Sequence, residues 1–410
     1  MKHIYIFCMQ SSGVVYGIGT YIQQLTETLK DRKDVSLNVV IRHSDETEFT
    51  IKETDGIRTF YLSRINKQYN PKFDDLYNRN LCFLLRPYIR LGLSDQLIFH
   101  LNYYEEGSCI PCFRKAFPDC KIIFTIHCQR WCFFLNGNTT YFKKLIRERK
   151  EDLHDTEKFI LTSYETEKKV LQSVDLIICL AAYTENILIE DYQILPEKIV
   201  TIYNGLKDEG KILLKNERNE LRRKMSFPEN ELIILFVGRL DQIKGLDILI
   251  RAFKVVLRTY AHARLIVVGD GEFNLYLKEC KGLWDRITFT GRLDRQSVYD
   301  FYQIADVGVI PSFHEQCSYV AIEMMMFGLP IVVSTSTGLS EMVNADLEPY
   351  KVQVLEIEKS ATILPEELAT KLMTILENRI SAISIRKNYE ERFSIQTMGR
   401  KYNAMIEQFK

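Results

Sequence analysis

The sequence lacks several features that would assign it to a class of protein at once. Its formal charges cancel, with 54 Lys and Arg against 54 Asp and Glu, so no overall field would hold it on a nucleic acid or an anionic membrane. No apolar run approaches the roughly 20 residues that cross a bilayer, because the best candidate, residues 176–188, contains Glu185 and Asn186. We therefore expect no nucleic-acid partner, no spanning helix and at most a peripheral association with a membrane.

The sequence also has little that resembles a secreted protein. Residues 3–8 form only a short apolar stretch without a small-residue cleavage site, so they predict a first strand and not a signal peptide. Its 10 cysteines are irregularly spaced over 410 residues, which is typical of reduced thiols and not of a disulfide framework. The sequence therefore predicts a cytoplasmic protein.

Four of the cysteines have a spacing close to that of a zinc site. Cys109, Cys112, Cys128 and Cys132 form the pattern C-x2-C-x15-C-x3-C, which a structural zinc ion could use. The alternative is four free thiols, because cysteine is often a small buried residue. We expect the free thiols and no metal.

Strand and helix patterns alternate from end to end, which predicts an α/β fold with parallel sheets. A chain of 410 residues is also long enough for two or more domains. Apolar runs typical of strands lie at residues 3–8, 36–41, 97–101, 121–127, 174–180, 199–203, 232–237, 264–268, 287–290, 307–310 and 331–333. Helical patterns lie at residues 20–29, 142–159, 245–258, 297–304, 319–327, 365–378, 381–391 and 396–409.

The boundary between two doubly wound halves should follow Asn204 and Gly205, which give a turn signal before the charged stretch 207–224. We expect a first Rossmann-like domain over residues 1–205 and a second over residues 206–395. The last helix predicts that residues 396–410 return to the first domain.

A glycine-rich loop follows the first predicted strand. Gly13, Gly17 and Gly19 precede a helix, and glycines let a backbone approach a ligand while the N–H groups of a helix start favour an anion. The run lacks the third glycine of a dinucleotide fingerprint, which argues against a dehydrogenase. A tight turn without a ligand would use the same residues.

The second half begins with an apolar strand that ends at Gly238 and Arg239, and Lys244 follows just before a helix. Parallel strands gather their following loops at one edge of the sheet, where ligands bind. A guanidinium and an ammonium at that edge are suited to a diphosphate. Plain surface charge is the other interpretation.

Two glutamates form the pattern E-x7-E. Glu323 lies among apolar residues, where a carboxylate is costly unless it is hydrogen-bonded, and ligand hydroxyls are good partners. Glu315 precedes the same helix, and Cys317, Ser318 and Tyr319 would offer backbone N–H groups. The alternative is a capping carboxylate followed by an unrelated glutamate.

Together these motifs resemble glycosyltransferase family 4, whose members have the GT-B fold. The resemblance covers nearly the whole chain, and it rests on Gly13 to Gly19, Thr125-Ile126-His127, Tyr203-Asn204-Gly205, Val237-Gly238-Arg239, Lys244-Gly245, Val268-Gly269-Asp270-Gly271, Glu315 to Glu323, Gly328-Leu329-Pro330 and Gly338-Leu339-Ser340-Glu341. It implies two Rossmann-like domains facing a cleft. It also implies an enzyme without cofactor or metal that transfers a hexosyl group from a nucleotide-diphospho-sugar, a UDP-sugar by family frequency, with retention of configuration.

The resemblance also implies roles for single residues. Arg239 and Lys244 would bind the diphosphate and stabilise the charge of the leaving group, in place of a metal. Glu323 would bind the ribose hydroxyls, and Glu315 would contact the hydroxyls of the donor sugar. The donor would further contact Gly17, Gly19, Asn204, Gly238, Arg292, Leu293, Cys317, Ser318 and Tyr319. His127 would reach the transferred sugar or the acceptor.

The chain departs from the family pattern at several positions. Gln316-Cys317-Ser318 stands where Pro-Phe-Gly is common, Thr337 replaces a second glycine before Gly338, and Cys128 follows His127 where an acidic residue is common. These departures affect the donor sugar. His127 has a second interpretation, since a histidine at a strand end can simply bond a neighbouring carbonyl.

The acceptor remains open among glycans, lipid-linked glycans and peptides. The run Tyr16 to Tyr21 is similar to a bacterial subgroup of predicted glycosyltransferases linked to peptide modification. Two alternative functions also remain open: a nucleotide-sugar epimerase of the same fold, and a catalytically silent partner subunit that resembles a glycosyltransferase.

Overall fold

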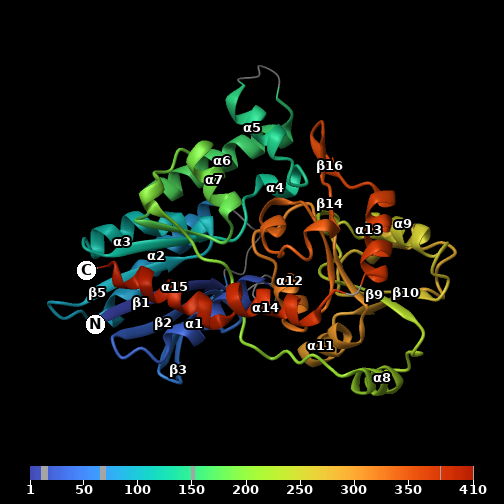
Figure 1. Cartoon of the computed structure of the whole chain (residues 1–410). Coiled ribbons are helices and arrows are strands. Elements are labelled where there is room, and N and C mark those ends of the chain that lie inside the picture. Colours follow the sequence, from blue (N-terminus) through green and yellow to red (C-terminus); the bar gives the residue numbers. More distant parts are fainter. Residues whose placement is uncertain (11–16, 65–70, 149–152, 379, 410) are drawn as a thin grey trace. The chain divides into compact units, whose positions relative to one another are not determined.

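The computed structural model describes residues 1–10, 17–64, 71–148, 153–378 and 380–409, and it divides into two compact units (Figure 1). The first unit comprises Met1–Gln129, Lys158–Gly205 and Ile395–Lys410, and the second comprises Arg130–Glu157 and Leu206–Ser394. Residues 130–157 therefore pack with the second unit, although the sequence assigns them to the first domain.

The first unit is built on an eight-stranded sheet of order β3-β4-β2-β1-β5-β6-β7-β8, in which only β3 and β4 pair antiparallel. The central strands are nearly continuous apolar runs, as buried parallel strands are. The strands are β1 (Lys2–Met9), β2 (Val35–Ser44), β3 (Thr50–Thr54), β4 (Ile57–Ser63), β5 (Gln96–Leu101), β6 (Lys121–Ile126), β7 (Leu176–Cys179) and β8 (Ile199–Thr201).

Helices of the first unit connect these strands. They are α1 (Gly17–Leu29), α2 (Pro71–Leu85), η2 (Arg86–Tyr88), η3 (Tyr104–Cys109), α3 (Ile110–Ala116), α6 (Asp155–Ser173), α7 (Ala182–Glu190), η4 (Pro196–Lys198) and the last helix, α15 (Ile395–Glu407). Figure 1 shows α15 lying beside α1, although nearly the whole chain separates them in sequence. The Tyr402 hydroxyl of α15 is hydrogen-bonded to the Tyr21 hydroxyl of α1 in the buried interior.

The second unit has a six-stranded parallel sheet of order β11-β10-β9-β12-β13-β14 and a separate hairpin of β15 and β16. The strands are β9 (Leu232–Val237), β10 (Ala263–Val268), β11 (Ile287–Gly291), β12 (Val307–Ile310), β13 (Ile331–Ser334), β14 (Lys351–Val352), β15 (Leu355–Ile357) and β16 (Ser360–Thr362). Two close approaches shape the edge of this sheet. A Cβ at Gly269 would lie 1.9 Å from the Gly238 carbonyl oxygen, and one at Gly245, where φ is +68°, would lie 2.3 Å from the Pro311 oxygen.

The described helices of the second unit include three short 3-10 segments. They are α4 (Trp131–Phe134), α5 (Thr139–Arg147), α8 (Lys215–Lys224), η5 (Gln242–Lys244), α9 (Leu246–Val256), α10 (Phe273–Leu277), α11 (Arg295–Ile304), α12 (Tyr319–Met326), η6 (Thr337–Glu341), η7 (Glu348–Tyr350), α13 (Pro365–Glu377) and α14 (Ala382–Arg392). Helices α9 and α13 pack side by side (Figure 1).

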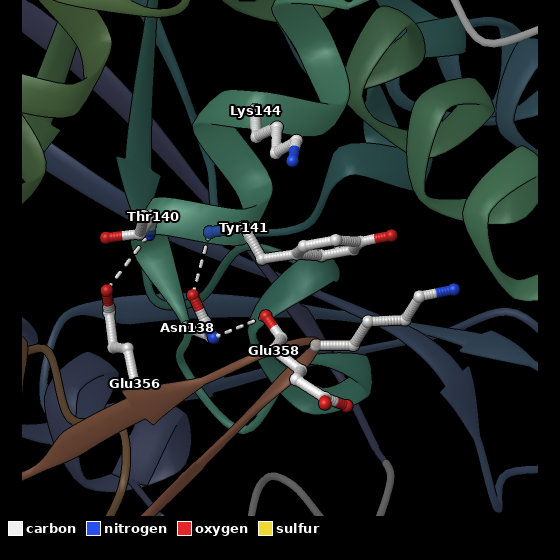
Figure 2. A pocket seen from close by; sticks show the side chains of 7 residues that line it. Asn138, Thr140, Tyr141, Lys144, Glu356 and Glu358 are labelled. Carbon is white, nitrogen blue, oxygen red and sulfur yellow. Dashed lines mark hydrogen bonds between the residues drawn. The ribbon is translucent and has the colours of Figure 1, made fainter.

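The β15–β16 hairpin holds α5 in the second unit (Figure 2). The carboxylate of Glu356 accepts hydrogen bonds from the N–H groups of Thr139 and Thr140 at 2.7 and 3.2 Å, where the positive end of the α5 dipole favours an anion. The Asn138 amide donates to the carbonyl oxygens of Glu358 and Ser360 at 3.2 and 2.7 Å. A cavity of about 540 Å³ lies here, and Asn138, Thr140, Tyr141, Lys144, Glu356, Glu358 and Lys359 line it.

The predicted α/β fold and the eleven predicted strands are confirmed. The prediction of one helix over residues 142–159 is wrong, because α5 ends at Arg147 and α6 begins at Asp155. The second start has its own cap, since Glu157 Oε2 accepts from the His154 N–H at 2.9 Å. Strands β3, β4, β14, β15 and β16 were not predicted.

No helix within the described ranges is long and apolar enough to cross a membrane.

Candidate functional site

Lys244 and Glu315 form an ion pair at the carboxyl edge of the second sheet. The Lys244 Nζ lies 2.6 Å from Glu315 Oε1, and the two side chains are 20% and 13% exposed. The Gly245 turn brings η5 against the segment after β12, where the Phe313 N–H donates to the Ile243 carbonyl oxygen at 2.8 Å. Two of the predicted site residues, distant in sequence, therefore meet at the place where ligands bind in parallel sheets.

Arg239 lies at the end of β9, on the rim of the same edge. Its guanidinium contacts Asp241 at 3.0 Å, and it is 43% exposed. Burial raises the pKa of Asp241, while Arg239 and Lys244 lower it and Glu315 raises it. Each of the two predicted diphosphate-binding cations thus has a carboxylate beside it, and the sequence did not predict this role for Asp241.

The backbone of Glu315 is fixed by Thr337, one of the departures from the family pattern. The Thr337 hydroxyl accepts from the Glu315 N–H at 3.0 Å and donates to its carbonyl oxygen. The Gly338 N–H donates to the same oxygen at 2.9 Å. These bonds engage only the backbone of Glu315. Its side chain bonds Lys244 through Oε1, and Oε2 has no partner among the residues that the structure describes.

Glu323 projects from α12 toward α11. The Tyr302 hydroxyl donates to Glu323 Oε2 at 2.8 Å. Burial raises the pKa of Glu323 to about 6, although the Tyr302 hydrogen bond and Arg295 lower it; Glu209 raises it. Within the described ranges nothing bonds Oε1, so this oxygen can accept a ligand hydroxyl. The sequence predicted the carboxylate but not its tyrosine partner, because α11 and α12 meet only in the fold.

The start of α12 places the predicted backbone donors. Ser318 is the N-cap, and its hydroxyl oxygen accepts from the Ala321 N–H at 3.4 Å. Cys317 is buried, and Tyr319 is half-buried at the first helical position. The Ser318 N–H points to Met342 Sδ at 3.2 Å.

The predicted base-contacting pair lies at the far side of this sheet. Arg292 is exposed and Leu293 half-buried, directly after β11. Strand β10 separates β11 from β9 and therefore from Gly238 and Arg239. The structure thus places the pair at the same edge as Lys244, but two strands away.

The remaining predicted residues belong to the first unit. Gly17 and Gly19 lie in the first turn of α1, Gly13 lies outside the described residues, and Asn204 is buried after β8. His127 is half-buried after β6, and its Nε2 lies 2.9 Å from Asn102 Oδ1. It therefore bonds the carbonyl oxygen of a neighbouring side-chain amide, which agrees with the second interpretation, and its contact with a substrate stays a prediction.

The environment of His127 is neutral and largely aromatic. Its ring contacts Tyr21 edge-on, with 4.7 Å between the ring centroids. Burial lowers the pKa of His127 to about 3, and that of His100 likewise to about 3. The Thr125 hydroxyl bonds His100 Nε2 at 2.7 Å and the Tyr21 hydroxyl at 2.9 Å. Both imidazoles are neutral at pH 7.

All ten cysteines are free thiols. In the part of the chain that the structure describes, no cluster of three or more His, Cys, Asp or Glu side chains could hold a metal ion. Cys109 and Cys132 are fully buried, and Cys112 and Cys128 are partly exposed. Burial raises the pKa of the Cys109 thiol, so this thiol is unreactive at neutral pH.

Two family models match the chain, one described as Glycosyltransferase Family 4 over residues 15–209 and one as Glycosyl transferases group 1 over residues 217–392. An uncharacterized glycosyltransferase of Methanocaldococcus jannaschii is 28% identical over 240 residues, which are 54% of this chain and 60% of that protein. The lipopolysaccharide 1,2-N-acetylglucosaminetransferase of Salmonella typhimurium is 26% identical over 199 residues, 43% of this chain and 52% of that protein. The matches span about half the length of these curated relatives.

Solved structures resemble the whole chain. Sucrose-phosphate synthase from Thermosynechococcus elongatus has a TM-score of 0.74 at 20% identity and covers 98% of both chains. The Anabaena protein HepE in complex with UDP has a TM-score of 0.70 at 17% identity, over 98% of this chain and 99% of its own. The fold is therefore GT-B. The chain belongs to the family 4 glycosyltransferases.

Proposed function

We propose that the protein is a retaining glycosyltransferase that moves a hexosyl group from a UDP-sugar to a hydroxyl group of its acceptor without a divalent metal. The observation that carries the proposal is the contact of Lys244 Nζ with Glu315 Oε1 at 2.6 Å, at the carboxyl edge of a parallel sheet. A cation for the leaving group and a carboxylate for the sugar hydroxyls are thereby adjacent.

The second unit binds the donor in this proposal. Arg239 and Lys244 contact the diphosphate, together with backbone groups of Gly238, Ser318 and Tyr319. Glu315 accepts hydrogen bonds from donor sugar hydroxyls through Oε2, and Glu323 accepts them from the ribose through Oε1. The free carboxylate oxygens of both glutamates support these roles, since no described residue bonds either oxygen.

Uridine is the proposed base. Structures of the Anabaena protein HepE contain UDP, UDP with glucose, and UDP-glucose, and their resemblance to this chain supports the same donor class here. The base would lie near Arg292 and Leu293. The side chain of Cys317, in place of an aromatic residue, would border the sugar and influence which hexose is accepted.

The reaction breaks the bond between the anomeric carbon and the diphosphate oxygen, and it forms a bond from the same carbon to the acceptor oxygen. The acceptor hydroxyl approaches from the face that the diphosphate leaves, so the configuration is retained. Its proton passes to the leaving phosphate. Arg239 and Lys244 stabilise the negative charge that develops on the diphosphate, and this supports metal independence, as does the lack of a D-x-D triplet.

The first unit is the proposed acceptor side. His127 would contact a sugar hydroxyl, and Gly17, Gly19 and Asn204 would contribute to donor binding. The acceptor is a glycan, a lipid-linked glycan or a peptide. We place the reaction in the cytoplasm, with at most a peripheral contact to the membrane, and the ten free thiols support that compartment.

Calorimetric titration with UDP, ADP and GDP in the presence of EDTA tests this proposal. We expect saturable binding of UDP that EDTA does not change, followed by slow hydrolysis of a UDP-hexose to the α-configured sugar. A strict requirement for Mg²⁺ would contradict the metal-independent mechanism. Conversion of the UDP-hexose to its epimer without any acceptor would identify an epimerase instead.

A further inference from the structure

The side chains of Asn102 and His127 meet at the carboxyl edge of the first sheet, after the neighbouring strands β5 and β6. Asn102 is 4% exposed. Its Nδ2 donates to the Phe7 carbonyl oxygen of β1 at 2.9 Å, and its Oδ1 lies 2.9 Å from His127 Nε2. A carbonyl oxygen only accepts, so the contact with Phe7 identifies the amide nitrogen, and the atom that faces His127 is the oxygen.

This orientation determines where the His127 ring carries its hydrogen. The amide oxygen of Asn102 can only accept, so Nε2 must donate. A neutral imidazole has one N–H group, and burial keeps this ring neutral by lowering the pKa of His127 to about 3. Nδ1 therefore has a lone pair, and the described residues provide no partner for it.

Asn102 is itself held by a buried ion pair. Glu106 Oε2 accepts from the N–H groups of Asn102 and Tyr103 at 2.8 and 3.1 Å. Glu106 Oε1 contacts Arg42 Nη1 at 3.0 Å, and both charged side chains are fully buried. Because breaking a buried pair is strongly destabilising, these contacts fix the backbone of Asn102, and the bond from Nδ2 to the Phe7 carbonyl oxygen holds the amide.

We infer that Asn102 is a positioning residue for the transfer reaction: it holds His127 in the Nε2–H tautomer, so that Nδ1 accepts a hydrogen bond from a hydroxyl group of a sugar substrate. The inference rests on the proposed function, since it requires His127 to contact substrate. The tautomer determines which groups can bond Nδ1. A hydroxyl can donate a hydrogen bond to it, whereas a carbonyl or ether oxygen cannot. His127 thus binds and orients a hydroxyl, and it does not remove a proton.

Nitrogen NMR of protein labelled with [¹⁵N]histidine tests the tautomer without any substrate. The two ring nitrogens of His127, assigned by comparison with His127→Gln, should show a protonated Nε2 and an unprotonated Nδ1. In Asn102→Ala the two shifts should move toward each other as both tautomers become populated. Asn38→Ala is the matched control, because Asn38 is 1% exposed in the same sheet and bonds Ile4 and Ser36. Shifts that do not change in Asn102→Ala would overturn the inference.

A double-mutant cycle tests the consequence for the reaction. Asn102→Ala should lower kcat about tenfold, as the loss of one well-oriented hydrogen bond does, with little change in the KM of the donor. His127→Ala should lower kcat at least as much, and the double variant no further. Effects that multiply in the double variant would overturn the positioning role, because they would show that Asn102 acts independently of His127.

Failure of the proposed function would look different. A wild-type enzyme that neither binds nucleotide sugars nor transfers a hexose would remove the reaction role of Asn102 together with the proposed function. The imidazole shifts would still decide the tautomer. Normal transfer by Asn102→Ala, with mixed tautomers in its spectrum, would overturn the positioning role alone.

Discussion

The candidate site residues of the two units differ in charge. The second unit has two ion pairs at its candidate site: Lys244 contacts Glu315, and Arg239 contacts Asp241. In the first unit His127 meets a neutral amide, and Tyr21 packs against its ring. A diphosphate requires placed cations, whereas a neutral hydroxyl requires oriented hydrogen-bond acceptors. In the proposed reaction, charge stabilisation would therefore be concentrated in one unit, and hydroxyl recognition would extend over both.

The largest effect should come from removing the paired cation. Lys244→Ala should lower kcat by about 100-fold to 1000-fold, because one donor to a developing oxyanion contributes about that much. Steady-state kinetics with a UDP-hexose would measure the loss. Lys254→Ala is the control, because Lys254 lies 3.7 Å from Glu279 and is 39% exposed, and its kcat should match the wild type. An equal loss in both variants would contradict a specific role for Lys244.

Substitution of Glu323 should give the next largest effect, and the pH dependence of kcat/KM should distinguish the second unit from the first. The pKa of Glu323 is raised to about 6 by burial, while burial lowers the pKa of His100 and of His127 to about 3. Only ionised Glu323 accepts two hydrogen bonds, so kcat/KM for a UDP-hexose should fall as the pH drops below about 6. Glu323→Gln should remove this pH-dependent fall in kcat/KM and weaken UDP binding about tenfold. His127→Gln should retain the fall.

The same pKa has a consequence for stability. The folded pKa of Glu323 lies above its usual value, so the native state binds the proton more tightly and the ionised form costs free energy above pH 6. Glu323→Gln should therefore increase the free energy of unfolding by about 1–2 kcal/mol at pH 8 and by less at pH 5. Urea unfolding at the two pH values measures this, and a loss of stability at pH 8 would be the contrary result.

A smaller effect is expected in the buried hydroxyl network of the first unit. Tyr402→Phe removes the bond between the Tyr402 and Tyr21 hydroxyls, and it should cost about 1 kcal/mol of unfolding free energy. Activity should change less than in Lys244→Ala. Urea unfolding followed by circular dichroism gives the value, and Tyr61→Phe, a residue without a hydroxyl bond among the described contacts, serves for comparison.

The smallest effect is expected at the surface hairpin of the second unit. Glu356→Gln removes the charge that caps α5 at Thr139 and Thr140, which should cost about 0.5–1 kcal/mol. Hydrogen exchange should increase in residues 139–147 and not in α12. Glu358→Gln is the control, because Glu358 contacts Asn138 only through its backbone oxygen.

Much of the fold could be predicted because buried parallel strands are short apolar runs. Strand β4 was missed because Arg58 and Thr59 interrupt its pattern, and β14 because it has two residues. The site glutamates and cations were predicted from motifs that lie within a few residues of one another. Tyr302 and Asn102 were not, since each meets its partner across different elements, and no spacing in the sequence records such a contact.

The path of the chain has a consequence for any attempt to divide the molecule. The backbone passes between the two compact units at four places, near residues 129, 157, 205 and 394. A cut after Gly205 would leave residues 130–157 without the hairpin that binds α5, and it would leave β1 and α1 without α15. Neither fragment would contain all residues of its own unit, so we expect each fragment to be less stable than the same unit in the intact chain.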